Sequence, residues 1–98
     1  MNIELEKIRK EISLNCEILE RDFSLSKIGV FGSVAKGTAT EKSDIDFLVE
    51  FKQQIGLFEF AGLNLFLENI FQKKVDIGTP RALKSMIRDE VLKSVIYI

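Results

Sequence analysis

Hydrophobic side chains recur at steps of three and four residues along the first fifth of the chain. Charged side chains fill most of the positions between them, and the apolar positions are Leu5, Ile8, Ile12, Cys16 and Leu19. This period is typical of an amphipathic α-helix that turns one face to a core. We therefore predict one helix over residues 3–22. Because Cys16 falls on its apolar stripe, we expect a small buried side chain there rather than a reactive thiol.

Three short segments have the pattern of β-strands. Residues 27–31 (KIGVF) form a short apolar run, and residues 45–52 (IDFLVEFK) alternate in polarity. Alternation with a period of two is expected where one face of a strand contacts a core. Residues 75–79 (VDIGT) form a third apolar run that contains one acid, Asp76.

A second helix is predicted over residues 57–71, and it is too apolar to bury only one face. Its main apolar stripe consists of Phe60, Leu63, Leu67, Ile70 and Phe71. Phe58 and Leu65 fall nearly opposite that stripe, and Phe66 flanks it. Either another part of the chain covers these three side chains or they form an exposed contact surface. The sequence leaves both interpretations open.

The end of the chain combines a helix start with a β-prone tail. Thr79-Pro80 supplies a hydroxyl N-cap followed by proline at the first helical position. We predict that a last helix begins there and carries Leu83, Met86, Ile87 and Val91. The apolar tail SVIYI (residues 94–98) predicts a terminal strand that pairs with the sheet.

The order of these elements predicts the fold class. The strand–helix–strand segment over residues 45–79 predicts a right-handed crossover that joins two parallel strands. The remaining strands make the sheet mixed. We therefore predict an α+β (α/β) protein, a small mixed β-sheet with helices packed on it. Its 98 residues are the length of one small domain, so we predict a single domain over residues 1–98.

Composition restricts the chemistry and the surroundings of the protein. The chain has no histidine and one cysteine, which excludes Ser-His-Asp and Cys-His catalysis, cysteine or histidine zinc sites and an internal disulfide. The formal net charge of -1 gives no overall attraction to nucleic acid or to an anionic membrane. No apolar run has membrane-spanning length, and the first residues lack a signal-peptide pattern. We expect a cytoplasmic protein that binds neither nucleic acid directly nor a membrane.

Two acids, Asp44 and Asp46, stand at the entrance of the second predicted strand. Side chains two residues apart on a strand point to the same side, so their carboxylates repel each other. A solvated strand entrance is the simpler interpretation of such a pair taken alone. Asp76 changes this, because its strand is predicted to run parallel beside the second one. Three neighbouring acids favour a shared site for Mg²⁺, and in the metal-free protein they are expected to raise the pKa of one of them.

A glycine and a serine, Gly32 and Ser33, follow directly after the first predicted strand. Residues 33–36 predict one helical turn that Gly37 ends in a left-handed cap. Free N–H groups at the start of that turn and the Ser33 hydroxyl would suit a phosphate, whereas an ordinary turn is the alternative. A phosphate site beside a metal-binding acid pair predicts a metal–nucleotide site.

These residues together carry a family resemblance. Gly32-Ser33, Asp44-x-Asp46 and a later lone Asp76 resemble the nucleotidyltransferase superfamily of DNA polymerase β type. The segment GSVAKGTATEKSDIDFLVEF, with GLFEF, KKVDIGTPRALK and the terminal VIYI, is similar to the minimal nucleotidyltransferases, the MntA-like antitoxins of bacteria and archaea. The resemblance covers most of the chain and implies the nucleotidyltransferase (polymerase β palm-like) fold.

The resemblance implies an Mg²⁺-dependent reaction in which AMP is transferred from ATP and pyrophosphate is released. Asp44 and Asp46 would bind two Mg²⁺ ions, and Asp76 would hold the catalytic ion with them. Gly32 and Ser33 would hold the β- and γ-phosphates.

Lys36 departs from the family pattern, which most often has arginine at this position. Lysine keeps the positive charge but lacks the two-pronged guanidinium. It is a candidate phosphate-binding residue, and a solvated turn lysine is the equal alternative.

The resemblance also implies a partner. In such two-gene toxin–antitoxin pairs the partner is a HEPN-domain ribonuclease toxin, and AMP is added to a tyrosine hydroxyl of the toxin. The second apolar face around Phe58, Leu65 and Phe66 would suit docking onto that helical partner, while self-association stays open. Two alternatives remain: an antitoxin that neutralises its toxin by binding alone, and a nucleotidyltransferase that modifies a small molecule such as an antibiotic.

Overall fold

Helices and strands alternate along most of the chain. The structure, a computed structural model, describes residues 3–40, 42–83 and 85–98, without the side chains of residues 3, 85 and 86. Within those residues the order is α1 (Ile3–Leu14), α2 (Cys16–Phe23), β1 (Leu25–Phe31), α3 (Gly32–Lys36), β2 (Ile45–Phe51), α4 (Leu57–Phe71), β3 (Val75–Gly78), α5 (Ser85–Ser94) and β4 (Ile96–Tyr97). The predicted α+β class is confirmed. None of the helices in this described part is long and apolar enough to cross a membrane.

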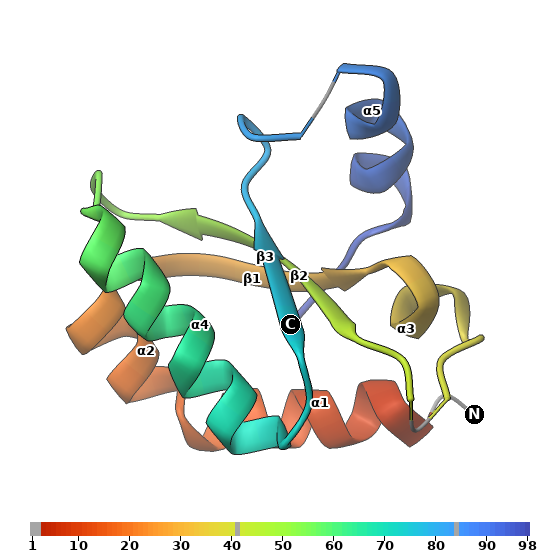
Figure 1. Cartoon of the computed structure of the whole chain (residues 1–98), viewed down its shortest axis with the longest axis horizontal. Helices are drawn as coiled ribbons and strands as arrows, with labels where there is room; N and C mark the ends of the chain where they lie inside the picture. Colours follow the sequence, from red (N-terminus) through yellow and green to blue (C-terminus); the bar gives the residue numbers. More distant parts are fainter. Residues whose placement is uncertain (1–2, 41, 84) are drawn as a thin grey trace.

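One mixed sheet of four strands organises the fold (Figure 1). The strands lie in the order β3-β2-β1-β4. β1 is antiparallel to both β2 and β4, whereas β2 and β3 are parallel and are joined through α4. The predicted crossover is therefore confirmed. The predicted terminal strand is confirmed as well, because Gly29 pairs with Tyr97 and Val30 with Ile96.

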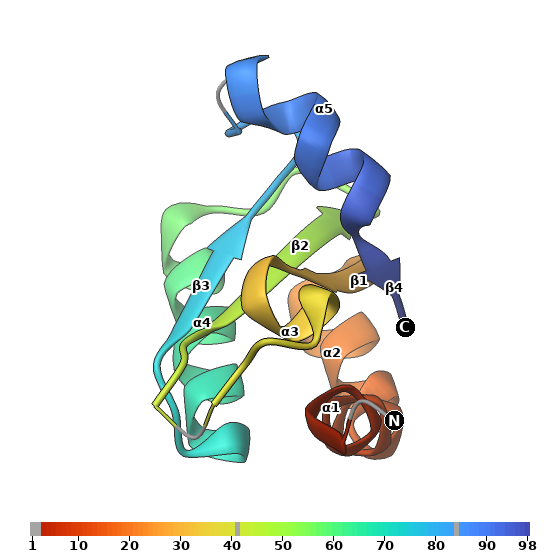
Figure 2. The ribbon, with the colours of Figure 1, turned by 90° about the vertical axis from the view of Figure 1, so that its right-hand side faces the viewer.

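The alternating pattern of β2 fixes which face of the sheet is covered by most of the helices. Phe47 and Val49 are fully buried and belong to the same core cluster as Ile8, Leu63 and Leu67. Figure 2 shows α1, α2 and α4 together on one side of the sheet and α5 on the other. Shifting the register of a strand by one residue would turn all its core side chains to the opposite face, so this packing also holds the register of β2.

The prediction of one continuous helix over residues 3–22 is wrong, because the structure has two helices, α1 and α2, in this segment. The segment is broken at Asn15, whose backbone lies at φ -110° and ψ 10° and whose side-chain amide donates a 2.8 Å hydrogen bond to the carbonyl of Glu11. Asparagine side chains compete in this way with helical backbone bonds. After the break, α2 buries Leu19 but leaves Cys16 exposed. The prediction that Cys16 is buried is therefore also wrong.

The last helix begins later than predicted. The Thr79 hydroxyl accepts a 3.2 Å hydrogen bond from the N–H of Ala82, as an N-cap would, but this turn does not continue into a helix. The guanidinium of Arg88 donates to the carbonyl of Leu83 at 3.1 Å, and α5 starts only at Ser85. Leu83 therefore precedes the helix that was predicted to carry it.

Of the other side chains assigned to that helix, Ile87 lies on α5 but is exposed, Val91 is half-buried, and the Met86 side chain lies outside the described ones.

The two apolar faces predicted for α4 have different environments. Leu63 and Leu67 are buried on the main stripe. On the second face Phe66 packs against Phe23 of α2, with ring centroids 5.5 Å apart. Phe58 and Leu65 are 90% and 65% exposed. Another element therefore covers one of the three side chains, and the other two face solvent.

We predict that Gly29→Ala destabilises the fold by detaching the terminal strand. A Cβ at Gly29 would lie 2.8 Å from Cγ2 of Val95 and 3.0 Å from the carbonyl oxygen of Ile96. The expected loss in unfolding free energy is about 1–3 kcal/mol, measured by urea denaturation. The matched control is Gly62→Ala within α4, where the new Cβ would make an ordinary 3.5 Å contact with the ring of Phe23. That variant should gain up to about 1 kcal/mol from helix propensity; equal stabilities of the two variants would contradict the prediction.

Candidate functional site

The turn before β2 places Asp44 directly before the first residue of this strand. The N–H of Ser43 donates to the carbonyl of Thr40 at 3.0 Å, and the N–H of Thr40 donates to the Ser43 hydroxyl at 2.9 Å. On the other side of Asp44, the N–H of Ile45 donates to the carbonyl of Lys74 at 3.1 Å. Asp44 is therefore held between a closed turn and the first contact of β2 with the segment that leads into β3.

The structure brings the three predicted acids together. Asp46 of β2 and Asp76 of β3 are register partners in the parallel pair, and Asp44 lies two residues before Asp46. Asp44 and Asp76 are exposed, whereas Asp46 is half-buried. Burial, and then the negative charges of Asp76 and Asp44, raise the pKa of Asp46. The predicted rise in the pKa of one of the three acids is thus confirmed, and Asp46 is the one affected.

The carboxylate of Asp46 lies directly against the backbone of Gly32. β1 and β2 pair Phe31 with Asp46, so the residue after β1 faces this acid. Gly32 has φ +69°, and a Cβ at this position would collide with Oδ2 of Asp46. Glycine has no Cβ that could collide with Asp46, and it adopts positive φ without a steric penalty. Gly32 is therefore needed to place an acid, before any ligand is considered.

A single helical turn, α3, begins at this contact. Phe31 precedes it in an extended conformation and contributes no side-chain cap. Ser33 is half-buried, and its carbonyl accepts a 2.9 Å hydrogen bond from the N–H of Thr38. Gly37 ends the turn at φ 76°, so the predicted left-handed cap is confirmed. The start of α3 thus lies beside Asp46, and its N-cap residue Phe31 makes no capping hydrogen bond through its side chain.

Lys36 lies at the other end of α3 and is exposed. No ion pair within the described residues joins it to Asp44, Asp46 or Asp76. The structure therefore does not bring Lys36 to the acids.

The acids are suited to a metal only as part of its coordination shell. Among the residues that the structure describes, no group of three or more acidic, histidine or cysteine side chains is placed to hold a metal ion. Mg²⁺ usually takes one or two carboxylates and completes its octahedron with water and substrate phosphates. One or two carboxylates of Asp44, Asp46 and Asp76 would fit that pattern, with water and a triphosphate as the other ligands.

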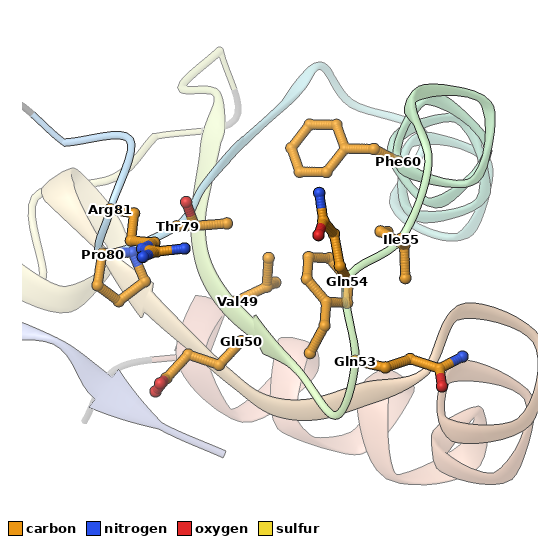
Figure 3. Close-up of a pocket in the computed structure, with 10 residues that line it drawn as sticks. Val49, Glu50, Gln53, Gln54, Ile55, Phe60, Thr79, Pro80 and Arg81 are labelled. Carbon is orange, nitrogen blue, oxygen red and sulfur yellow. The ribbon is translucent and has the colours of Figure 1, made fainter.

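A separate cavity of about 550 Å³ lies at the other ends of β2 and β3. Figure 3 shows it between Phe60 of α4 and the turn that contains Thr79 and Arg81, with Gln54 pointing into the space. The acids lie at the starts of these strands, so this cavity is not the site that they form. Its lining comes from three separate segments of the chain, which is why no pattern in the sequence indicated it.

The sequence matches a known family over almost its whole length. Residues 5–98 match the nucleotidyltransferase domain family. The protein adenylyltransferase MntA of Thermococcus cleftensis is 37% identical to this chain over 94 residues, which are 96% of this chain and 95% of that protein. A solved structure described as a minimal nucleotidyltransferase is also 37% identical and has a TM-score of 0.79, covering 94% of this chain and 93% of that one.

The fold is shared more widely. A crystal structure of a toxin–antitoxin with AMP-PNP has a TM-score of 0.69 at 24% identity, covering 86% of this chain and 69% of that one. At that identity the likeness concerns the fold alone. The match to the family, and the relative that is 37% identical over nearly the full length of both chains, carry the assignment. This chain therefore belongs to the nucleotidyltransferase domain family and is a nucleotidyltransferase enzyme.

Proposed function

We propose that this nucleotidyltransferase is the antitoxin of a toxin–antitoxin pair and transfers AMP from ATP to a tyrosine hydroxyl of a HEPN-domain toxin. The observation that carries the proposal is the contact between two halves of one site. Asp46, which lies beside Asp44 and Asp76, is against Gly32, where the helical turn α3 begins. Carboxylates beside the start of a helical turn suit a metal-bound triphosphate.

The reaction is a displacement at the α-phosphorus of ATP. The oxygen of the acceptor hydroxyl forms a bond to this phosphorus, and the bond to the oxygen that bridges the α- and β-phosphates breaks. Pyrophosphate leaves with that oxygen, and the acceptor proton passes to a base or to water. Asp76 is exposed at the edge strand and is the residue we assign to accept or direct this proton.

Two Mg²⁺ ions would be held by Asp44, Asp46 and Asp76. When bound, such ions stabilise negative charge on the attacking and leaving oxygens. The half-buried carboxylate of Asp46 is central to this set, because it lies next to each of the other two acids along the chain or across the sheet. In the metal-free protein the negative charges of Asp44 and Asp76 repel the Asp46 carboxylate. Cation binding would remove this repulsion.

The β- and γ-phosphates would lie at the start of α3. Backbone N–H groups at Gly32 and the hydroxyl of Ser33 are the donors that we assign to them. Lys36 lies at the far end of α3 and, among the described side chains, pairs with none of the three acids. We therefore assign its positive charge only a long-range attraction to the triphosphate.

Two findings about other proteins support a protein acceptor. The relative from Thermococcus cleftensis, which matches nearly the full length of this chain, is named a protein adenylyltransferase. A toxin–antitoxin structure with an ATP analogue shares the fold. The HEPN identity of the toxin and the tyrosine acceptor come from the family resemblance.

Neutralisation by binding alone is the second candidate function. The specific observation that favours it is the exposure of Phe58 and Leu65, which offers an apolar contact surface that needs none of the acids. The two functions differ in whether the acids are required for neutralisation.

We predict that Asp44→Asn combined with Asp46→Asn abolishes AMP transfer, because the neutral amides no longer hold the cations. The expected loss of transfer rate is at least about 100-fold, measured with α-labelled ATP and the purified toxin. The same variant should fail to protect cells from the toxin while still binding it. Full protection by the double variant would contradict the enzymatic function and favour neutralisation by binding.

We predict that Asp46→Asn alone raises the melting temperature of the metal-free protein in EDTA. The amide removes a half-buried negative charge that Asp76 and Asp44 repel. The expected result is a higher melting temperature, and solvent screening of this partly exposed carboxylate limits the size of the gain. Asp22→Asn is the control, because that exposed carboxylate accepts a 2.9 Å hydrogen bond from Arg21 and its loss should give no gain. Equal or lower stability of Asp46→Asn would contradict the account of the acid group.

We predict that Gly32→Ala impairs AMP transfer at least about tenfold, because the new Cβ displaces the Asp46 carboxylate. Gly37→Ala is a matched control: its φ of +76° gives the same backbone strain, but no atom lies within 4 Å of its Cβ position. Both variants should lose similar stability in urea denaturation. Only Gly32→Ala should lose most of its activity, and equal activities would show that the contact with Asp46 does not matter.

A further inference from the structure

The order of groups across the sheet gives the reaction a direction. From β1 through β2 to β3 the site presents Ser33, then Asp46, then Asp76. With the β- and γ-phosphates at Ser33, pyrophosphate leaves on the β1 side. The attacking and leaving oxygens lie on opposite sides of the phosphorus in such a transfer, so the acceptor hydroxyl must come from the β3 side. β3 is an edge strand, and an acceptor can therefore reach the site over its open edge.

α4 borders that edge of the sheet. Its C-terminal end leads through residues 72–74 directly into β3, and Figure 2 shows both elements on the same side of the molecule. The outer face of α4 carries a row of exposed side chains, here called the α4 ridge, made of Phe58, Ala61 and Leu65. Phe58 and Leu65 are two helical turns apart, about 10 Å along the axis, with the small Ala61 between them. This spacing suits contact with a second helix.

A groove runs beside the α4 ridge. Its lining includes Phe23, Phe66 and the acid Glu68, and also Lys73 and Lys74 of the segment that leads into β3. Lys73 pairs with Glu4 at 3.6 Å, whereas Lys74 is exposed and no ion pair of it is found among the described residues. Two lysines therefore adjoin the apolar part of the groove, and the Glu68 carboxylate beside them accepts a 3.1 Å hydrogen bond from the N–H of Val75.

We propose that the α4 ridge and this groove dock the acceptor protein through an amphipathic helix that lies along α4 with an acidic end at Lys74. The segment that follows this helix then brings the acceptor tyrosine over the edge of β3 to Asp76. The inference rests on the proposed function, because it takes the acceptor to be a protein and Asp76 to be part of the reaction centre.

The test compares Phe58→Asp and Leu65→Asp with a matched control, Leu14→Asp. Leu14 is 69% exposed, close to the 65% of Leu65, but lies at the end of α1. Two quantities are measured with the HEPN-domain product of the adjacent gene: its dissociation constant without nucleotide, by calorimetry, and the kinetics of AMP transfer with Mg²⁺ and ATP. Circular dichroism verifies that each variant is folded.

Both charged variants are expected to raise the dissociation constant and the KM for the toxin at least about tenfold, with kcat at saturating toxin unchanged. Leu14→Asp should change neither quantity. Lys74→Gln should weaken binding a few-fold at low salt and reduce its salt dependence. A wild-type protein that binds the toxin through the α4 ridge but transfers no AMP would contradict the proposed function and leave the docking surface standing.

Three results would overturn the docking surface. One is binding by Phe58→Asp and Leu65→Asp as tight as by Leu14→Asp. A second is a lower kcat of these two variants with an unchanged dissociation constant, which would mean that they impair AMP transfer rather than toxin binding. The third is a wild-type dimer that Leu65→Asp dissociates without loss of toxin binding, which would assign this face to a second copy of the chain.

Discussion

The contact between the Asp46 carboxylate and the α-carbon of Gly32 is the constraint on which the whole candidate site depends. It leaves no room for a side chain at Gly32, whose φ is also positive. On its other side Asp46 faces Asp76 across the parallel strands. The acid is therefore held between the start of α3 and the other carboxylates, in a position where burial and their charges make its own negative charge unfavourable. Like-charge repulsion of this kind is expected where a site is built for a metal.

The topology of the sheet produces this contact from segments that are distant in the sequence. The antiparallel pairing of β1 and β2 brings Gly32 to Asp46, and the crossover through α4 brings β3 alongside with Asp76 in register. Burial of Phe47 and Val49 under the helices holds that register, because a slip of one residue would send Asp46 into the core. The hydrophobic core thus determines the chemistry of the opposite face.

Periodicity and spacing in the sequence predicted the three longer strands, the crossover and the grouping of the acids, since these depend on local pattern and on general rules of chain connection. The break at Asn15, the exposure of Cys16 and the late start of α5 were missed. The side chain of Asn15 bonds to the carbonyl of Glu11 at the break, and that of Arg88 bonds to the carbonyl of Leu83 before α5. A pattern of apolar and polar positions does not indicate such individual bonds. The pattern could also not decide that Phe23 covers Phe66, because this contact joins two helices that are far apart in the sequence. For the same reason the contact of Gly32 with Asp46 became visible only in three dimensions.

The central claim is that the acids act on the α-phosphate of ATP with a partner protein as acceptor. It is tested most directly by the intact mass of the HEPN-domain toxin after incubation with this protein, Mg²⁺ and ATP. The account predicts that the mass rises by one or more AMP units, that the added groups map to tyrosine, and that EDTA prevents the change. A toxin that is fully inhibited in the complex while its mass stays the same would contradict the account.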